Sequence, residues 1–149
     1  MRMWFFGVMG LWLLGSEPLL AAPAPIMIQL TQTACQFVEA EPQDYGFKSK
    51  ESADCISINQ RTQDKRLVSS ETLHLKPGAY VFRVQNRDVP YVLGFWLRGQ
   101  GLGRITLPSV SGGNIQTGGF KDYPITLKEG EYLYSCPLNP TPDYRLVVK

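Results

Sequence analysis

The sequence contains a single histidine, His74, and this scarcity limits the chemistry that the chain can perform. A Ser-His-acid triad and a catalytic zinc site both depend on histidine in most of their known forms. His74 alternates with Leu73 and Leu75, so we expect its side chain to face solvent on a strand. No catalytic set of residues can be assembled around it, and the sequence predicts a protein that is not an enzyme.

Charged residues are also few, at 19% of the chain, and the formal net charge is only +2. Nucleic acids and anionic membranes are recognised through clustered positive charge, whereas the lysines and arginines here are scattered. We therefore expect neither partner. Glu39 and Glu41 are two residues apart and could form a carboxylate pair on one strand face, but we interpret them as a solvent-exposed face.

The N-terminus has the pattern of a secretory signal peptide. Arg2 precedes an apolar run from Met3 to Leu14, and small residues follow at Ala21 and Ala22. The apolar run is too short for a permanent membrane span, although a retained N-terminal anchor is the alternative. We expect a signal peptide at 1–22, one domain at 23–149, a periplasmic or secreted location, and no stable membrane span once the leader is removed.

The three cysteines, Cys35, Cys55 and Cys136, all follow this leader. Because two cysteines pair readily in an oxidising compartment, we expect a disulfide between Cys35 and Cys55. Closing a loop of about 20 residues contributes roughly 3 kcal/mol in the chain-entropy model. Cys136 is then left as a buried inert thiol, a ligand, or a partner for another chain.

Short alternating segments separated by glycine and proline predict an all-β fold, a sandwich or barrel of antiparallel strands. One helix is expected in the segment after Cys35, from Ala53 to Arg66, with Ser52 as its cap and Ile56 and Leu67 facing the sheets. The glycine-rich run 94–119 leads into strand residues rather than a helix, so we interpret it as connections between strands, not as a phosphate-binding loop. The expected strands are 26–30, 36–40, 72–75, 80–84, 91–97, 105–107, 124–127, 132–136 and 144–148.

The last two strands form a hairpin, GEYLYSCPLNPTPDYRLVV, from Gly130 to Val148. Alternation places Tyr132, Tyr134 and Cys136 on one face. The connecting loop contains prolines at positions 137, 140 and 142, which remove conformational freedom before anything binds. A rigid loop beside a thiol is typical of a metal site.

This hairpin resembles the C-terminal hairpin of plastocyanin-type cupredoxins. The similarity rests on Gly130 and Tyr132, on Cys136 after them, and on the returning apolar strand. Upstream, the segments Leu75-Lys76-Pro77-Gly78, Tyr80 to Asn86 and Val89-Pro90 are similar to the family as well, so the resemblance extends over Leu73 to Lys149. It implies a β-sandwich of Greek-key, cupredoxin-like topology and membership of a metal-handling or respiratory pathway.

The resemblance also implies where copper ligands would lie, and the sequence departs from the family there. Tyr91 occupies the position of the first histidine, Asn139 that of the second, and Tyr144 lies near the usual axial methionine. Only the thiolate of Cys136 is kept, so a conventional type 1 copper site is not expected. The remaining candidate metal ligands are Cys136, Tyr91, Asn139 and Tyr144. Thiolate favours Cu(I) and phenolate suits Fe(III), so the set selects no single ion.

Two hypotheses of function follow. In the first, the chain is an accessory metal-binding or redox-associated protein, with a degenerate copper or iron site and a periplasmic redox or metal-handling partner. In the second, it is a metal-free binding module whose aromatic end meets a protein or a small ligand. The aromatic residues considered for that end are Tyr45, Phe47, Tyr91, Phe95, Trp96, Phe120, Tyr123 and Tyr144.

Overall fold

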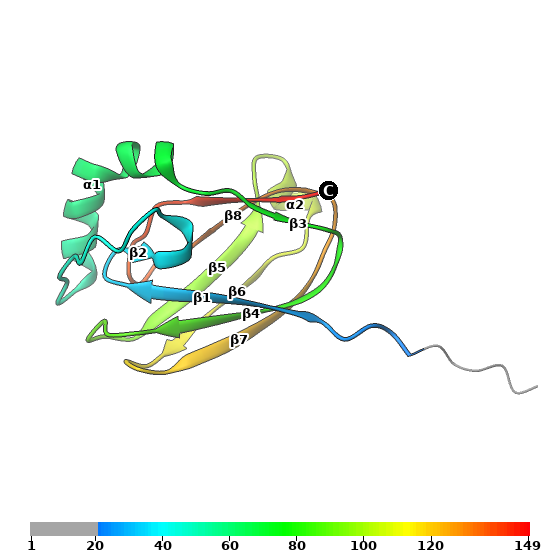
Figure 1. Cartoon of the computed structure of the whole chain (residues 1–149), viewed down its shortest axis with the longest axis horizontal. Coiled ribbons are helices and arrows are strands. Elements are labelled where there is room, and N and C mark those ends of the chain that lie inside the picture. The colour runs from blue at the N-terminus through cyan, green and yellow to red at the C-terminus, as the bar shows by residue number, and fades with distance from the viewer. Residues whose placement is uncertain (1–20) are drawn as a thin grey trace, which may run out of the picture.

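The computed structural model describes residues 21–149, so the expected signal peptide lies outside the described residues except for Ala21 and Ala22. Two sheets pack face to face (Figure 1). The first has the order β2-β1-β4-β7, and the second the order β3-β9-β8-β5-β6. The strands are β1 (Ile26–Thr33), β2 (Gln36–Phe37), β3 (Leu73–Leu75), β4 (Gly78–Asn86), β5 (Leu93–Gly99), β6 (Val110–Ile115), β7 (Phe120–Leu127), β8 (Gly130–Ser135) and β9 (Tyr144–Val148). The all-β sandwich is confirmed, and its Greek-key connection stays a prediction.

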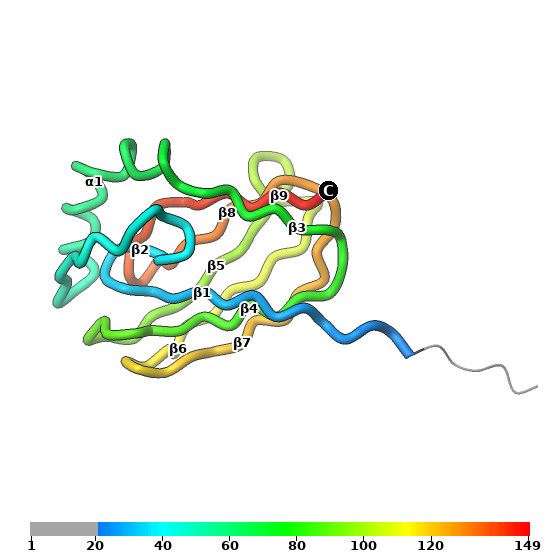
Figure 2. Tube along the Cα trace, viewed as in Figure 1, coloured from blue at the N-terminus to red at the C-terminus, as the bar shows by residue number. Residues whose placement is uncertain are grey.

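Strand pairing is mixed, because two pairs run parallel. Strand β1 is parallel to β4, with Ile26 opposite Tyr80, and β3 is parallel to β9, with Leu73 opposite Leu146. The segment Lys76-Pro77 carries the chain from β3 in one sheet to β4 in the other, as the trace in Figure 2 shows. Strands β3 and β4 are therefore joined by a crossing between the sheets.

The core lies between the sheets and is rich in aromatic rings. Phe95 of β5 packs within 6.1 Å, centroid to centroid, of Phe37 and within 5.8 Å of Phe82, so it joins the two sheets. Tyr132, Tyr134 and Cys136, which the alternation placed on one face, are all buried in the core. Edge-to-face and offset aromatic contacts of this kind stabilise a core beyond the area they bury.

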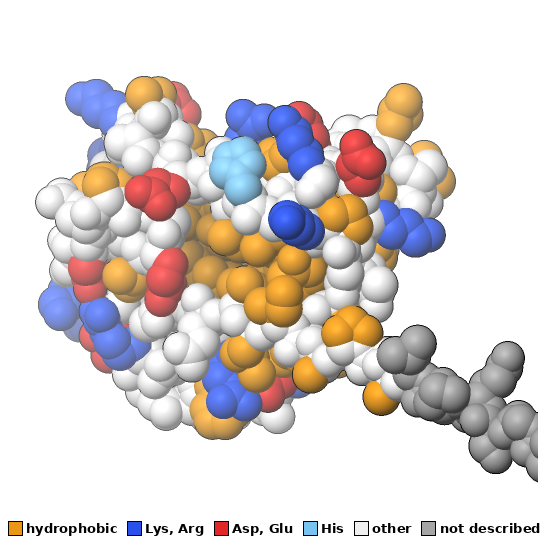
Figure 3. All heavy atoms as spheres, turned by 45° about the vertical axis from the view of Figure 1, so that its right-hand side comes forward, with side chains coloured by type: hydrophobic (Ala, Val, Ile, Leu, Met, Phe, Trp, Pro, Cys, Tyr) orange, Lys and Arg blue, Asp and Glu red, His pale blue; other side chains and the backbone are white. Residues whose placement is uncertain are grey.

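On one side of the sandwich, β1 and β3 lie at or near the edges of the two sheets. Strand β2 pairs with β1 only at Gln32 and Thr33, so most of β1 has no neighbour on that side. Strand β3 is the edge of the other sheet. Figure 3 shows hydrophobic side chains lining a hollow beside the single histidine, which is His74 on β3. His74 itself is exposed, as expected.

Helix α1 (Ser52–Ser69) covers one end of the sandwich and is longer at both ends than the expected 53–66 (Figure 1). Ser52 lies inside the helix, and Glu51 rather than Ser52 takes the capping position. The carboxylate of Asp54 accepts the backbone N–H groups of Lys50 and Glu51 at 2.8 and 3.3 Å, which closes the first turn. Leu67 packs against the core as expected, but Ile56 is exposed.

The strand expected at 105–107 is wrong, because Ile105 and Thr106 belong to the short helix α2 (Gly103–Thr106) and Leu107 follows that helix; the next strand, β6, begins at Val110. Local turn hydrogen bonds decide this geometry: Gly103 N–H donates to Gln100 and Leu107 N–H donates to Gly103. Gly101, with φ +57°, allows the reversal. The apolar, β-branched character of Ile105 suggested a strand, yet its side chain is 86% exposed.

The short strand expected at 36–40 continues only to Phe37 and then turns into the 3-10 helix Val38–Ala40. This turn redirects Glu41 inward, and its side chain is buried. The expectation that Glu39 and Glu41 share a solvent-exposed face is therefore wrong for Glu41. Glu39 stays exposed, and its carboxylate accepts the Thr31 N–H at 2.7 Å. No helix among residues 21–149 is long and apolar enough to cross a membrane.

Candidate functional site

Cys136 lies directly after β8, at the end of the sandwich where the loop 137–143 connects to β9; we call this region the loop end. Its thiol is free and 1% exposed. The backbone N–H groups of Asn139 and Gly94 point at the sulfur, at 3.2 and 3.4 Å. Burial raises the pKa of the Cys136 thiol, and these N–H groups offset only part of that rise. The thiol is therefore protonated at neutral pH.

Asn139 is brought next to Cys136, but its side chain is fully engaged. Its Oδ1 accepts the backbone N–H of Cys35 at 2.9 Å and the hydroxyl of Tyr91 at 3.3 Å. Its Nδ2 donates to the carbonyl of Thr33 at 2.9 Å and to the side chain of Gln32 at 3.4 Å. An amide side chain has two donors and one acceptor oxygen, so little capacity is left for a metal ion. Asn139 fastens the hairpin loop to the turn after β1.

The disulfide expected between Cys35 and Cys55 is present and joins that turn to α1, with the two Cα atoms 5.0 Å apart. Cys35 has φ 65°, a left-handed conformation that non-glycine residues adopt rarely. The Sγ of Cys55 lies 3.1 Å from Asn139 Oδ1, and because a disulfide sulfur carries no proton this is a packing contact. The bridge, the amide and Cys136 therefore form one compact group.

Tyr91 belongs to the same group through its hydroxyl, which lies 2.6 Å from the Ser49 hydroxyl. Partial burial raises the pKa of the Tyr91 phenol, so the neutral form is favoured. A metal-binding phenolate would have to lose this proton and its bond to Ser49. Tyr91 thus connects the loop before α1 to the loop end.

Tyr144 is not part of this group. Its hydroxyl bonds to the buried carboxylate of Glu41, which also receives two hydrogen bonds from Arg66. Burial, reinforced by the Glu41 carboxylate, raises the pKa of the Tyr144 phenol strongly. Of the four candidate ligands, the structure brings together Cys136, Tyr91 and Asn139, and it places the Tyr144 hydroxyl in a separate ion-pair network.

These donors do not fit a copper or iron site. In the described part of the chain, no three His, Cys, Asp or Glu side chains are grouped as a metal ion would need. Asn139 and Tyr144 are held by protein hydrogen bonds, and Cys136 is protonated. A type 1 copper site needs a thiolate and two imidazoles, and this group contains one free thiol and no imidazole.

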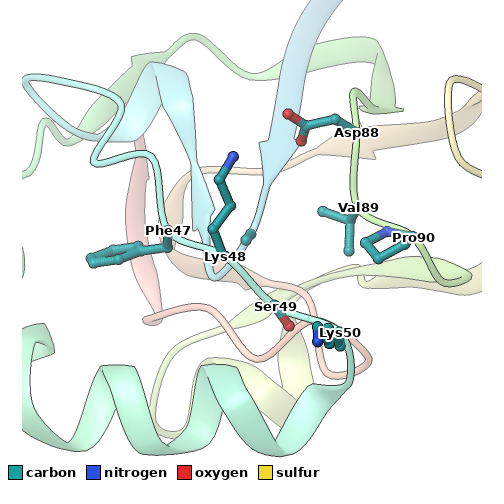
Figure 4. Close-up of a pocket in the computed structure, with 8 residues that line it drawn as sticks. Phe47, Lys48, Ser49, Lys50, Asp88, Val89 and Pro90 are labelled. Carbon is teal, nitrogen blue, oxygen red and sulfur yellow. The ribbon is translucent and has the colours of Figure 1, made fainter.

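A cavity of about 370 Å3 lies beside this group at the loop end. Ala34, Val89 and Pro90 provide apolar lining, and Lys48 and Asp88 carry opposite charges on facing sides, as Figure 4 shows. The side chain of Ser49 connects the cavity to the Tyr91 hydroxyl. The volume is within the range of small-ligand pockets, so an apolar group with charges on either side fits here. We call it the loop-end cavity.

Sequence reasoning missed several residues of the loop end. Lys48, Ser49 and Asp88 lie in loops without any periodic pattern, and no local signal identifies them. Asn86 was noticed only as part of the family resemblance. Its side chain bonds both the N–H and the carbonyl of Val89, at 2.9 and 3.2 Å, and so shapes the wall of the cavity. The Asn-x-x-Val spacing is the one signal that could have indicated this turn.

The aromatic residues expected at this end are mostly elsewhere. Phe95, Tyr123 and Tyr144 are buried in the core, Trp96 is half-buried, and Phe120 is exposed with the Arg83 guanidinium carbon 4.3 Å from its ring centroid. Tyr91 and Phe47 do contribute to the loop end: Tyr91 bonds to Ser49, and Phe47 lines the cavity and packs against Cys35 and Cys55. Compared with known proteins, the chain matches no protein-family model and no curated protein sequence.

Proposed function

We propose that the chain is an exported, metal-free binding module of the cupredoxin-like sandwich type, which receives a protein or small-ligand partner in the loop-end cavity. The observation that carries this proposal is a difference between the candidate metal ligands and the cavity next to them. The side chains at the former ligand positions bond to other groups of the chain, whereas the adjacent cavity offers apolar lining between Lys48 and Asp88. Binding energy is therefore available in the cavity rather than at a metal.

Three features support the sandwich type and the export. Cys136 follows β8, and the proline-containing loop leads into β9, as the resemblance implies. Sheets with parallel β1-β4 and β3-β9 pairs are compatible with a Greek-key, cupredoxin-like connection. The Cys35–Cys55 disulfide is consistent with a periplasmic or secreted protein, because such bridges persist in oxidising compartments.

A second candidate function, accessory metal binding or redox association, is supported by one observation. Two backbone N–H groups point at the Cys136 sulfur, and such donors stabilise a thiolate. A soft ion such as Cu(I) would then bind at Cys136, with Tyr91 and Asn139 beside it. This candidate requires the thiol to lose its proton against the effect of burial, so it ranks second.

Elemental analysis of the exported protein separates the two candidates. We expect copper and iron far below one equivalent in the wild type and in Cys136→Ser alike, and no change in Trp96 emission on adding Cu(I), Cu(II) or Fe(III). Stoichiometric metal that disappears in Cys136→Ser supports the second candidate. An intensely blue protein contradicts both the metal-free proposal and the argument against a type 1 site.

Photo-crosslinking in cells tests the cavity itself. A benzophenone amino acid at position 48 is expected to give a discrete crosslinked product that an Ala34→Arg substitution, which fills the cavity, removes. The matched control places the same probe at Lys128, an exposed lysine beyond the opposite end of β8. Identical products from positions 48 and 128, or no effect of Ala34→Arg, count against a partner at the loop end.

A further inference from the structure

A second cavity, of about 300 Å3, lies between the loop before α1 and the helix itself. It is lined by Tyr45, Phe47, Arg61, Thr62, Lys65 and Arg66. Phe47 is the only residue it shares with the loop-end cavity, and Figure 4 shows the Phe47 ring turned away from Lys48 and Val89. Phe47 therefore lies between the two cavities. We call this second space the helix cavity.

One wall of the helix cavity is aromatic and fixed in place. The rings of Tyr45 and Phe47 are stacked, with centroids 5.4 Å apart and planes 13° from parallel. The guanidinium carbon of Arg66 lies 4.9 Å from the Phe47 centroid and 5.5 Å from that of Tyr45. Arg66 is itself immobilised by Glu41. A wall ordered in advance lowers the conformational entropy lost when a ligand binds.

The other wall carries positive charge without a matching carboxylate. Arg61 and Lys65 are exposed and lie four residues apart on α1, so they share one face of the helix. Among residues 21–149, neither forms an ion pair with an acidic side chain. The charge of Arg66 is balanced by Glu41, and the nearby Asp64 does not line the cavity. Two uncompensated cations therefore face an aromatic wall.

We propose that the helix cavity binds a small planar aromatic carboxylate. The ring packs against Tyr45 and Phe47, where aromatic surfaces attract each other beyond simple burial. The carboxylate meets Arg61 and Lys65, and an arginine fork suits its two oxygens. The proposal concerns residues and a ligand class different from those of the loop-end cavity, so it stands or falls separately from the function proposed above.

The test is a titration of the 15N-labelled domain with 2-naphthoate, followed through backbone amide shifts. We expect saturable shifts confined to residues 45–47 and 61–66. Arg61→Gln/Lys65→Gln removes both charges at exposed positions and keeps good helix formers. It is expected to weaken binding about tenfold, the effect of losing two partly exposed ion pairs. The neutral analogue 2-naphthalenemethanol should lose affinity to a similar extent.

The control variant Lys48→Gln/Lys50→Gln removes the same charge at the loop-end cavity, and its affinity for 2-naphthoate is expected to match the wild type. Phe47→Leu should weaken binding of both the acid and the alcohol. Shifts centred on Ala34, Val89 and Pro90, equal affinity for acid and alcohol, or shifts that never saturate would each overturn the proposal. The last result means binding at high concentration only.

Discussion

The guanidinium of Arg66 on α1 donates hydrogen bonds to both carboxylate oxygens of Glu41, at 2.5 and 2.8 Å, with both side chains withdrawn from solvent. The same guanidinium donates to the carbonyl of Cys35 at 2.9 Å and to Asn59 at 2.7 Å. A buried ion pair is tolerated only when its remaining hydrogen-bonding groups are occupied as they are here. This pair and the Cys35–Cys55 disulfide hold the helix against the loop end.

Breaking this ion pair should strongly destabilise the fold. Glu41→Ala leaves the Arg66 charge buried and unpaired, which costs about 3 to 5 kcal/mol of unfolding free energy. Urea denaturation at neutral pH measures the loss. The control is Asp122→Ala, which removes the partner of Arg83 in an ion pair more than a third exposed, and it should cost less than about 1 kcal/mol. Equal effects of the two substitutions would contradict the role assigned to Glu41.

Removing the disulfide should destabilise the domain by a smaller amount. The bridge closes a loop with a sequence separation of 20, so Cys35→Ser/Cys55→Ser is expected to cost roughly 3 kcal/mol. Dithiothreitol should lower the urea midpoint of the wild type by a comparable amount and leave that of the double variant unchanged. If the urea midpoint of the wild type were the same with and without dithiothreitol, the bridge would not constrain the unfolded chain.

Substitution of Asn139 tests whether this residue has a structural role or binds a metal. Asn139→Asp keeps the shape but replaces the donor to the Thr33 carbonyl with an acceptor, which should cost about 1 to 3 kcal/mol. Asn114→Asp, at an exposed residue with φ 70° where aspartate is also tolerated, should change stability by less than about 0.5 kcal/mol. Chelators should leave the wild-type urea midpoint unchanged. A midpoint that falls on chelation would show that a bound metal stabilises the wild type, which contradicts the metal-free proposal.

Alkaline pH should destabilise the protein through its buried weak acids. Burial raises the pKa of the Cys136 thiol above 9.0 and that of the Tyr123 phenol from 10.0 to about 12. Their contribution to stability is complete below the unfolded pKa values and is lost as pH rises, because the unfolded chain releases these protons first. Each group contributes about 1.4 kcal/mol per pH unit between its unfolded and folded pKa.

Urea unfolding between about pH 8 and pH 10.5 measures this slope. Cys136→Ala removes one of the groups, so its stability should fall less steeply with pH than that of the wild type. Superimposable slopes would mean that the thiol titrates alike in the folded and unfolded chains, and would contradict its burial at the loop end.

The sequence predicted the sheets better than the connections between them. Strand alternation placed Tyr132, Tyr134 and Cys136 on one face, because side chains on a strand point alternately to opposite faces, and the structure shows that this face is buried. The region around Ile105 was wrong, since turn hydrogen bonds over four residues override the strand preference of one β-branched side chain. The predicted exposure of Glu41 was wrong for a different reason: the residue that pairs with it in the core, Arg66, is 25 residues away in the chain.

What the sequence alone determined is the all-β class, the Cys35–Cys55 pair and the exposed His74, all of which follow from local periodicity or from counting cysteines. Only the tertiary structure decided that Asn139 accepts the backbone N–H of Cys35, 104 residues away, and that the Tyr144 hydroxyl is hydrogen-bonded to the Glu41 carboxylate. It also placed the two cavities, whose walls come from separate segments. A local sequence pattern carries no information on which polar atoms form hydrogen bonds between residues so far apart in the chain. These hydrogen bonds decide whether a side chain remains available to a ligand.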